Sequence, residues 1–173
     1  MSVSRLASAD GPRPALINVD VSITVRNPGI SRGRTRDLVR ATLEREHIKN
    51  ALVSVAFVGV HTMSQLNRDF LAHNGPTDVI AFALGRRTGR SKRGHARTTP
   101  QRRQAGPVIG DIYICQAVAE RNARKLGIPL RQELARLVVH GTLHVLGYEH
   151  PRGDARISSN MWRRQEKILD FVK

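Results

Sequence analysis

The sequence of 173 residues contains a single cysteine, few aromatic residues and relatively few acidic ones. Cys115 alone cannot form an intrachain disulfide or a thiolate metal cluster, and its apolar surroundings predict a small core residue. The longest apolar run, residues 51–60, is too short to cross a bilayer, and the first residues lack the apolar core of a secretion signal. We therefore expect a cytoplasmic protein with no membrane partner.

Positive charge dominates the composition. Lysine and arginine number 29 against 14 acidic residues, which gives a formal net charge of +15. Such a surface attracts polyanions, because contacts of lysine and arginine with phosphate release the counterions condensed on nucleic acid. The charge favours RNA as a partner, but by itself it does not separate RNA binding from solubility or from attraction to anionic lipid.

The length predicts one domain, from residue 16 to residue 173, after a flexible polar tail over residues 1–15. Residues 85–106, GRRTGRSKRGHARTTPQRRQAG, interrupt this domain with eight lysines and arginines and no acid. This composition predicts a flexible, solvated basic loop. The loop lacks the order of glycine, lysine and serine or threonine that a phosphate-binding loop requires, so nucleotide binding is rejected.

Hydrophobic periodicity predicts four strands and five helices along the chain. The strands are expected at residues 17–25, 51–60, 78–82 and 108–115, and the helices at residues 35–47, 62–70, 116–125, 130–146 and 158–172. The first helix places Leu38, Val39, Thr42 and Leu43 on one face. The last helix is amphipathic, and its predicted core contacts are Met161, Trp162, Ile168, Leu169 and Phe171.

The segment HGTLHVLGYEH carries the chemistry that the sequence shows most clearly. His140 and His144 are four residues apart on a predicted helix, so both imidazoles leave the same face and can bind one ion. Gly147 can adopt the positive φ of a helix C-terminus and turn the chain so that His150 becomes a third ligand. Three nitrogen ligands leave the fourth tetrahedral position of Zn²⁺ for a zinc-bound water, whose pKa can fall to about 7.

The histidine spacing matches the zincin pattern H-E-x-x-H-x-x-G-x-x-H at every fixed position except the second. Gly141 stands where zincin proteases have the glutamate that acts as general base. Glu149, at the turn beside His150, is the nearest carboxylate in the sequence, and we expect it to face solvent or to support a ligand. The usual route of peptide hydrolysis therefore lacks its base.

These histidines resemble the signature H-G-x-L-H-x-x-G-[YF]-[DE]-H of the YbeY family of bacterial metal-dependent endoribonucleases. Two further segments are similar to that family, the run LNRDF at residues 66–70 and the run PTDVIAF at residues 76–82. Gly110, Asp111 and Ile112 are similar to its G-D-I strand, and the C-terminal helix also fits. The resemblance covers most of the chain from about residue 16 onward.

The resemblance implies a zinc-dependent, single-strand-specific endoribonuclease that acts in ribosomal RNA 3′-end maturation and ribosome quality control. It also implies an α+β, zincin-like fold with one mixed sheet of about four strands covered by helices, in which the helix carrying HxxxH holds the active site. The implied metal ligands are His140, His144 and His150, with one Zn²⁺ per chain. Thr77 and Asp78 are expected to line the substrate cleft, and the implied partners are ribosomal RNA and the small ribosomal subunit.

The sequence departs from the family at several positions that bear on activity, among them Asn74 in place of an acid before P-T-D and Ala81 in place of a serine. The arginine that follows the aromatic residue of L-N-x-x-[YF]-R, expected to hold the substrate phosphate, is Leu71 here. Arg68, one helical turn earlier, is the candidate replacement, since a guanidinium can bind phosphate through two hydrogen bonds. The candidate RNA contacts in the basic loop are Arg86, Arg87, Lys92, Arg93, Arg102 and Arg103.

Two alternative functions remain at this point. Leu71 allows a ribosome-associated RNA-binding factor that keeps the metal site but has lost activity. The zincin likeness also allows a metal-dependent hydrolase of another bond, such as an amide.

Overall fold

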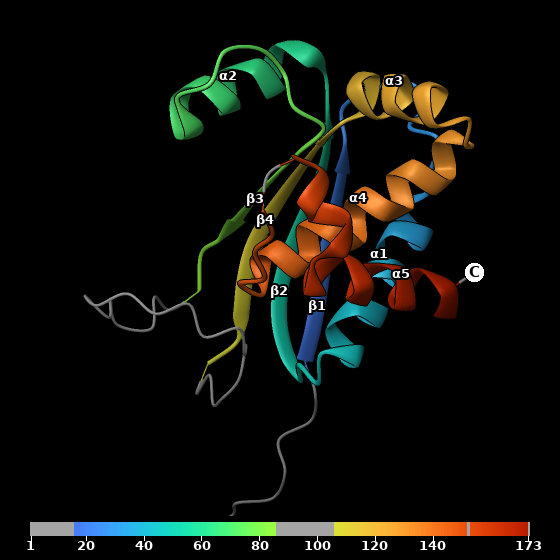
Figure 1. Ribbon diagram of the computed structural model, residues 1–173. Helices are drawn as coiled ribbons and strands as arrows, with labels where there is room; N and C mark the ends of the chain where they lie inside the picture. The colour runs from blue at the N-terminus through green and yellow to red at the C-terminus, as the bar shows by residue number, and fades with distance from the viewer. Residues whose placement is uncertain (1–15, 86–105, 152, 173) are drawn as a thin grey trace, which may run out of the picture.

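The computed structural model describes residues 16–85, 106–151 and 153–172 of the chain. The predicted N-terminal tail and all of the predicted basic loop except its two end glycines lie outside these ranges. Within the described ranges the chain forms four strands, five α helices and one short 3₁₀ helix (Figure 1). In chain order these are β1 (Leu16–Ile23), α1 (Arg32–Arg45), β2 (Asn50–Val58), α2 (Val60–Leu71), β3 (Val79–Ala83), β4 (Val108–Cys115), α3 (Gln116–Leu126), α4 (Leu130–Val145), η1 (Gly153–Ser158) and α5 (Asn160–Phe171).

The four strands form one mixed sheet in the order β1-β2-β4-β3. β1, β2 and β4 are parallel, whereas β3 pairs antiparallel with β4 at the edge. Since β2 and β4 are parallel, the helices that follow them, α2 and α3, both begin at the same end of the sheet, as Figure 1 shows. The architecture confirms the predicted α+β class with one mixed sheet of about four strands.

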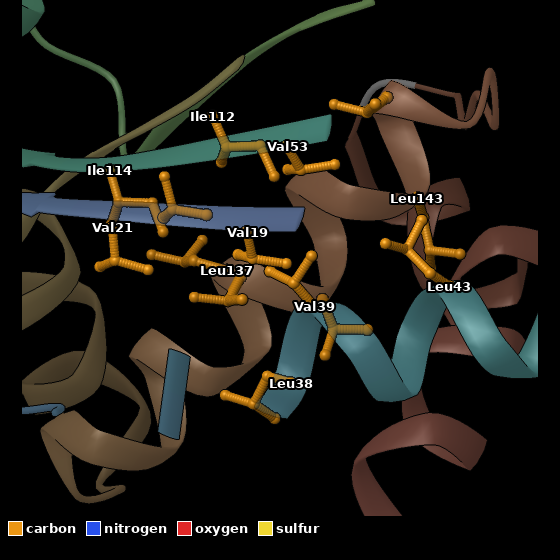
Figure 2. Packing of buried hydrophobic residues seen from close by; sticks show 14 of the residues in the cluster. Val19, Val21, Leu38, Val39, Leu43, Val53, Ile112, Ile114, Leu137 and Leu143 are labelled. Carbon is orange, nitrogen blue, oxygen red and sulfur yellow. The ribbon is translucent and has the colours of Figure 1, made fainter. Parts of the chain in front are cut away.

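The main hydrophobic core lies between one face of the sheet and helices α1, α4 and α5. Alternate residues of β1 and β2 are buried on this face, as strand geometry requires. Figure 2 shows Val19 and Val21 of β1 facing Val39 of α1 and Leu137 of α4. The predicted apolar face of α1 is confirmed, because Leu38, Val39, Thr42 and Leu43 are all inaccessible to solvent.

Helix α4 approaches the sheet closely because two glycines remove side chains from the contact. A Cβ atom at Gly110 of β4 would lie 2.4 Å from Val145 Cγ1, and one at Gly141 of α4 would lie 2.6 Å from Ile112 Cγ2. Either distance is shorter than a van der Waals contact allows, so both positions require glycine at this helix-to-sheet spacing. The position that follows the first histidine of the motif therefore faces the strands.

Most predicted elements are confirmed, and their ends are corrected. β4 has the predicted bounds, but β1 ends at Ile23, and α1 begins at Arg32 because the Ser31 hydroxyl accepts a hydrogen bond from the Arg34 amide. The predicted helix over residues 158–172 is confirmed as α5, which begins at Asn160 after the N-cap Ser159 and is preceded by η1.

One predicted core residue is wrong. Met161 and Ile168 of α5 are buried as expected, but 65% of Phe171 is exposed. Its ring lies under the guanidinium of Arg45, with 3.8 Å between the guanidinium carbon and the ring centroid. A cation–π contact at the surface thus takes the place of the predicted core packing. In the described part of the chain, no helix has both the length and the apolar character to cross a membrane.

The contact between Gly141 and Ile112 makes a testable prediction. We expect Gly141→Ala to lower the free energy of unfolding by about 1–3 kcal/mol, because the added methyl overpacks the interface between α4 and β4. Urea unfolding followed by circular dichroism measures this change.

Gly33→Ala is the matched control. Gly33 lies in helix α1, where the nearest non-neighbouring atom to an added Cβ would be Ser31 Oγ at 3.9 Å. Alanine there should leave stability unchanged or raise it by up to about 1 kcal/mol, because alanine has the higher helix propensity. Equal effects of the two substitutions would show that α4 does not depend on a glycine against the sheet.

Candidate metal centre

Helix α4 holds the first two histidines of the motif. His140 and His144 are one helical turn apart, and their Nε2 atoms are 3.1 Å from each other. Both side chains are partly buried, because the opposite face of α4 packs on the sheet and on α1. The helix therefore brings the Nε2 atoms of both histidines close enough to bind one ion.

A glycine turn at the end of α4 supplies the third histidine. Gly147 has φ of 86°, and the amides of Gly147 and Tyr148 donate hydrogen bonds to the carbonyls of His144 and Leu143. This is the Schellman arrangement that ends helices on a left-handed residue. It reverses the chain so that His150 Nε2 lies 3.2 Å from His140 Nε2, as the sequence predicts.

Each of the three imidazoles uses its other nitrogen in a hydrogen bond. Nδ1 of His140 lies 2.8 Å from Gln165 Oε1, that of His144 lies 2.9 Å from the carbonyl oxygen of Tyr148, and that of His150 lies 2.8 Å from the carbonyl oxygen of Pro151. An oxygen acceptor requires a proton on Nδ1, which leaves a lone pair on Nε2. All three lone pairs consequently point at one another.

This arrangement fits a zinc ion. Three nitrogens at about 2.05 Å from one ion with tetrahedral angles lie about 3.3 Å apart, close to the 3.1 and 3.2 Å observed. Without a cation, three converging lone pairs repel one another. Hydrogen bonds from Nδ1 to oxygen are also the usual support of metal-binding histidines. The three candidate ligand atoms lie within 4.8 Å of one another, and three protein ligands would leave the fourth position of a tetrahedral ion for a water.

The surroundings of His144 favour its neutral form. Burial lowers the pKa of His144, and the neighbouring His150 lowers that pKa further, while the Tyr148 carbonyl and Glu149 act in the opposite direction. A metal ligand must be the neutral imidazole, so the lowered pKa favours the form that binds. Glu149 itself is exposed, in agreement with the expectation from its place in the turn.

A partly buried polar cluster holds the turn that carries His150. The Tyr148 hydroxyl donates to Glu46 Oε2 at 2.5 Å, and Arg164 of α5 donates to Glu46 Oε1 at 2.8 Å. Burial raises the pKa of Tyr148, and the hydrogen bond to Glu46 raises it further. The end of α1, the turn and α5 are thereby joined next to the third ligand.

Sequence reasoning missed Gln165, the hydrogen-bond partner of His140. A signal was present, because Gln165 lies on the same stripe of α5 as Met161 and Ile168, and all three are buried. A polar side chain on the buried stripe of an amphipathic helix needs a partner in the interior. Here that partner is His140, a candidate metal ligand.

The predicted cleft residues Thr77 and Asp78 lie just before β3. Asp78 Oδ1 accepts from the Val79 amide at 2.9 Å and from the Thr77 hydroxyl at 3.1 Å, and Oδ2 accepts from Asn122 of α3 at 3.2 Å. The Asp78 carbonyl also accepts from the Cys115 amide at 2.8 Å. Asp78 thus ties the start of β3 to β4 and α3. A role of the two residues in substrate binding stays a prediction.

The other predicted RNA contacts are at the surface or outside the described residues. Arg68 is in the last turn of α2, with 62% of its side chain exposed and its Nε 3.6 Å from Asp69 Oδ1. Leu71 ends the same helix and is 44% exposed. The six basic residues Arg86, Arg87, Lys92, Arg93, Arg102 and Arg103 lie outside the described ranges.

Comparison with known proteins decides the family. A family model described as endoribonuclease YbeY matches residues 22–173. The chain belongs to the YbeY family. The YbeY endoribonuclease of Acidothermus cellulolyticus is 36% identical over 138 residues, which cover 79% of this chain and 80% of the relative. That of Persephonella marina is 28% identical over 144 residues, which cover 83% and 85% of the two chains.

The likeness extends to three dimensions. The solution structure of a Thermotoga maritima protein matches this fold with a TM-score of 0.56 and 25% sequence identity, over 90% of this chain and 89% of that chain. The resemblance inferred from the histidine motif is therefore confirmed. YbeY proteins are endoribonucleases, so the chain belongs to a family of hydrolytic enzymes, and its three-histidine cluster is able to hold a metal ion.

The convergence of the three imidazoles predicts one zinc ion per chain. We expect wild-type protein, loaded with zinc and passed through a desalting column, to retain one equivalent by elemental analysis, and His150→Ala to retain far less because two ligands remain. His61→Ala, which removes an exposed histidine of α2, is the matched control and should bind as wild type does. Equal retention by all three proteins would place the metal elsewhere.

Proposed function

We propose that the protein is a zinc-dependent, single-strand-specific endoribonuclease of the cytoplasm that acts in ribosomal RNA 3′-end maturation and ribosome quality control. The observation that carries the proposal is the trio of Nε2 lone pairs, each directed inward by a hydrogen bond at Nδ1. Membership of an endoribonuclease family supports RNA as the substrate. The net charge of +15 supports a partner as anionic as ribosomal RNA in the small subunit.

A zinc ion at this centre would supply Lewis-acid polarisation of a phosphoryl oxygen and a water of lowered pKa. The residues of the chain provide the rest. His140, His144 and His150 hold the ion with one side open, and Arg68 contacts a substrate phosphate from α2. Thr77 and Asp78 line the substrate cleft beside β3. The hydrogen bonds of Asp78 to the Val79 amide and to Asn122 join the start of β3 to α3 there.

Hydrolysis of an amide is the weaker alternative because of Gly141. A zincin protease would need a glutamate at this position, but a side chain there would meet Ile112 of β4. Glu149, the nearest carboxylate in the sequence, is exposed. The helix-to-sheet packing that positions the ligands thus excludes the usual general base of peptide hydrolysis.

The non-catalytic alternative rests on Leu71. This residue stands at the exposed end of α2 in place of the arginine that the resemblance leads us to expect. If Arg68 does not replace that arginine, the protein would bind RNA and metal without cutting.

Cleavage of a defined single-stranded RNA separates these functions. We expect zinc-loaded wild type to cut the RNA and His144→Ala to cut it on the order of a hundredfold more slowly or worse, because the centre then lacks one of its metal ligands. A double-stranded RNA of the same sequence is the control for strand specificity. Equal, metal-independent cleavage by both proteins would indicate a contaminating nuclease, and no cleavage by either would favour the binding factor.

The basic segment, residues 85–106, is proposed to guide RNA toward the metal centre. Replacing its six cations, Arg86, Arg87, Lys92, Arg93, Arg102 and Arg103, by glutamine keeps its length. We expect weaker RNA binding and a slope of log K against log salt reduced by about 0.7 for each RNA phosphate that the variant no longer neutralises. Fluorescence anisotropy at several salt concentrations measures both.

The control for bulk charge replaces three exposed cations of α3, Arg121, Arg124 and Lys125, by glutamine. For each charge removed, this variant should reduce the slope of log K against log salt by less than the six-residue variant does. An unchanged slope in the six-residue variant would reject the guiding role.

A further inference from the structure

The support of His140 differs from that of the other two ligands. His144 and His150 donate from Nδ1 to backbone carbonyls, those of Tyr148 and Pro151, which can only accept. His140 instead faces the side-chain amide of Gln165 on α5, which is fully buried. An amide carries an acceptor oxygen and a donor nitrogen of nearly the same shape, so its orientation decides what His140 can do.

The two orientations of Gln165 have opposite consequences for the metal. With Oε1 toward His140, Nδ1 carries the proton and Nε2 keeps its lone pair for an ion. With the amide reversed, the NH₂ group would donate to Nδ1, the proton would move to Nε2, and His140 could no longer bind. The fold therefore has to specify which way round this amide lies.

Glu166 fixes the orientation of the Gln165 side-chain amide. Gln165 Nε2 lies 3.0 Å from Glu166 Oε1, and an ionised carboxylate can only accept. Because a reversed amide would place its oxygen against this carboxylate, the contact fixes Nε2 toward Glu166 and Oε1 toward His140. The neighbouring residue in α5 thus determines the polarity of a hydrogen bond at the metal centre.

Arg136 of α4 holds Glu166 in place. Its Nε lies 3.3 Å from Glu166 Oε1 and its Nη2 lies 3.4 Å from Oε2, a two-point contact that fixes the plane of the carboxylate. The Arg136 side chain is 20% exposed, its Nη1 lies 3.7 Å from Glu133 Oε2, and its guanidinium carbon is 5.7 Å from the ring centroid of Trp162. These neighbours fix the guanidinium between α4 and α5.

We propose that Arg136, Glu166 and Gln165 form a relay that sets the tautomer of His140 and thereby the metal affinity of the centre. All three are positioning residues that act through His140. The proposal rests on the metal centre described above. Removing an outer hydrogen-bond partner of a metal ligand weakens metal binding by about 10- to 100-fold in other proteins, which sets the expected scale.

Zinc affinity, measured by competition with a chromophoric chelator, tests the relay. Gln165→Met keeps the size of the side chain but removes the acceptor, and we expect its zinc Kd to rise about 10- to 100-fold. Glu166→Gln leaves Gln165 in place but can pair with either end of its amide, and we expect a rise of about tenfold. Glu120→Gln, which removes an ion pair with Arg124 on α3, is the matched control and should bind as wild type does.

A rescue variant separates the relay from packing. In the double variant Gln165→Glu, Glu166→Gln, residue 165 has two equivalent oxygens, so no neighbour is needed to orient it. We expect this protein to bind zinc at least as tightly as wild type. A weakening in Glu166→Gln that persists in the double variant would show that Glu166 acts in another way and would overturn the proposal.

Nitrogen-15 spectra of the metal-free protein show the tautomer directly. We expect the His140 ring of wild type to carry its proton on Nδ1, and that of Glu166→Gln to show both tautomers. This measurement does not depend on metal, activity or stability. A single Nδ1 tautomer in Glu166→Gln would contradict the relay even if its zinc affinity fell.

The outcomes also separate this proposal from the metal centre on which it rests. If wild type fails to bind zinc, the metal centre is wrong. If wild type binds zinc and Gln165→Met binds equally well while folded, as judged by circular dichroism, the relay is wrong and the centre stands.

Discussion

The candidate metal centre depends on the direction of three lone pairs, those on Nε2 of His140, His144 and His150. Each of the three histidines has Nδ1 against an oxygen acceptor, which directs the Nε2 lone pairs inward, and Nε2 of His140 lies 3.1 and 3.2 Å from those of His144 and His150. Such an arrangement is unfavourable unless a cation lies among them. Helix α4 contributes two of the histidines, the chain after its Schellman motif contributes the third histidine and two carbonyl acceptors, and the buried face of α5 contributes the third acceptor.

The same helix meets a second constraint at the sheet. Gly110 and Gly141 let α4 approach β4 so closely that a Cβ atom at either position would clash with the side chain of Val145 or Ile112. This contact holds the histidine-bearing face at a fixed height above the strands, and it removes the carboxylate that proteases place beside their metal. The packing that positions the ligands therefore also restricts the chemistry, and it leaves phosphodiester cleavage as the function that fits family and site together.

Local sequence determined the ligands but not their supports. The bounds of β4, the left-handed Gly147 and the convergence of His140, His144 and His150 could be predicted, because each depends on neighbours within one or two helical turns. Gln165 could not be assigned to His140, since 25 residues separate them and only tertiary packing brings α5 onto α4. Phe171 was wrongly placed in the core because periodicity does not show that α5 ends beside Arg45.

The glycine turn after α4 has a consequence for how the protein responds to the cell. His150 lies beyond the turn, and η1 and α5 follow it, so a cation that joins His150 to His140 and His144 closes a short loop and clamps the last part of the chain onto the rest. Metal uptake and local ordering are then linked equilibria. A metal-free population would then have a looser C-terminal region that is more accessible to proteases.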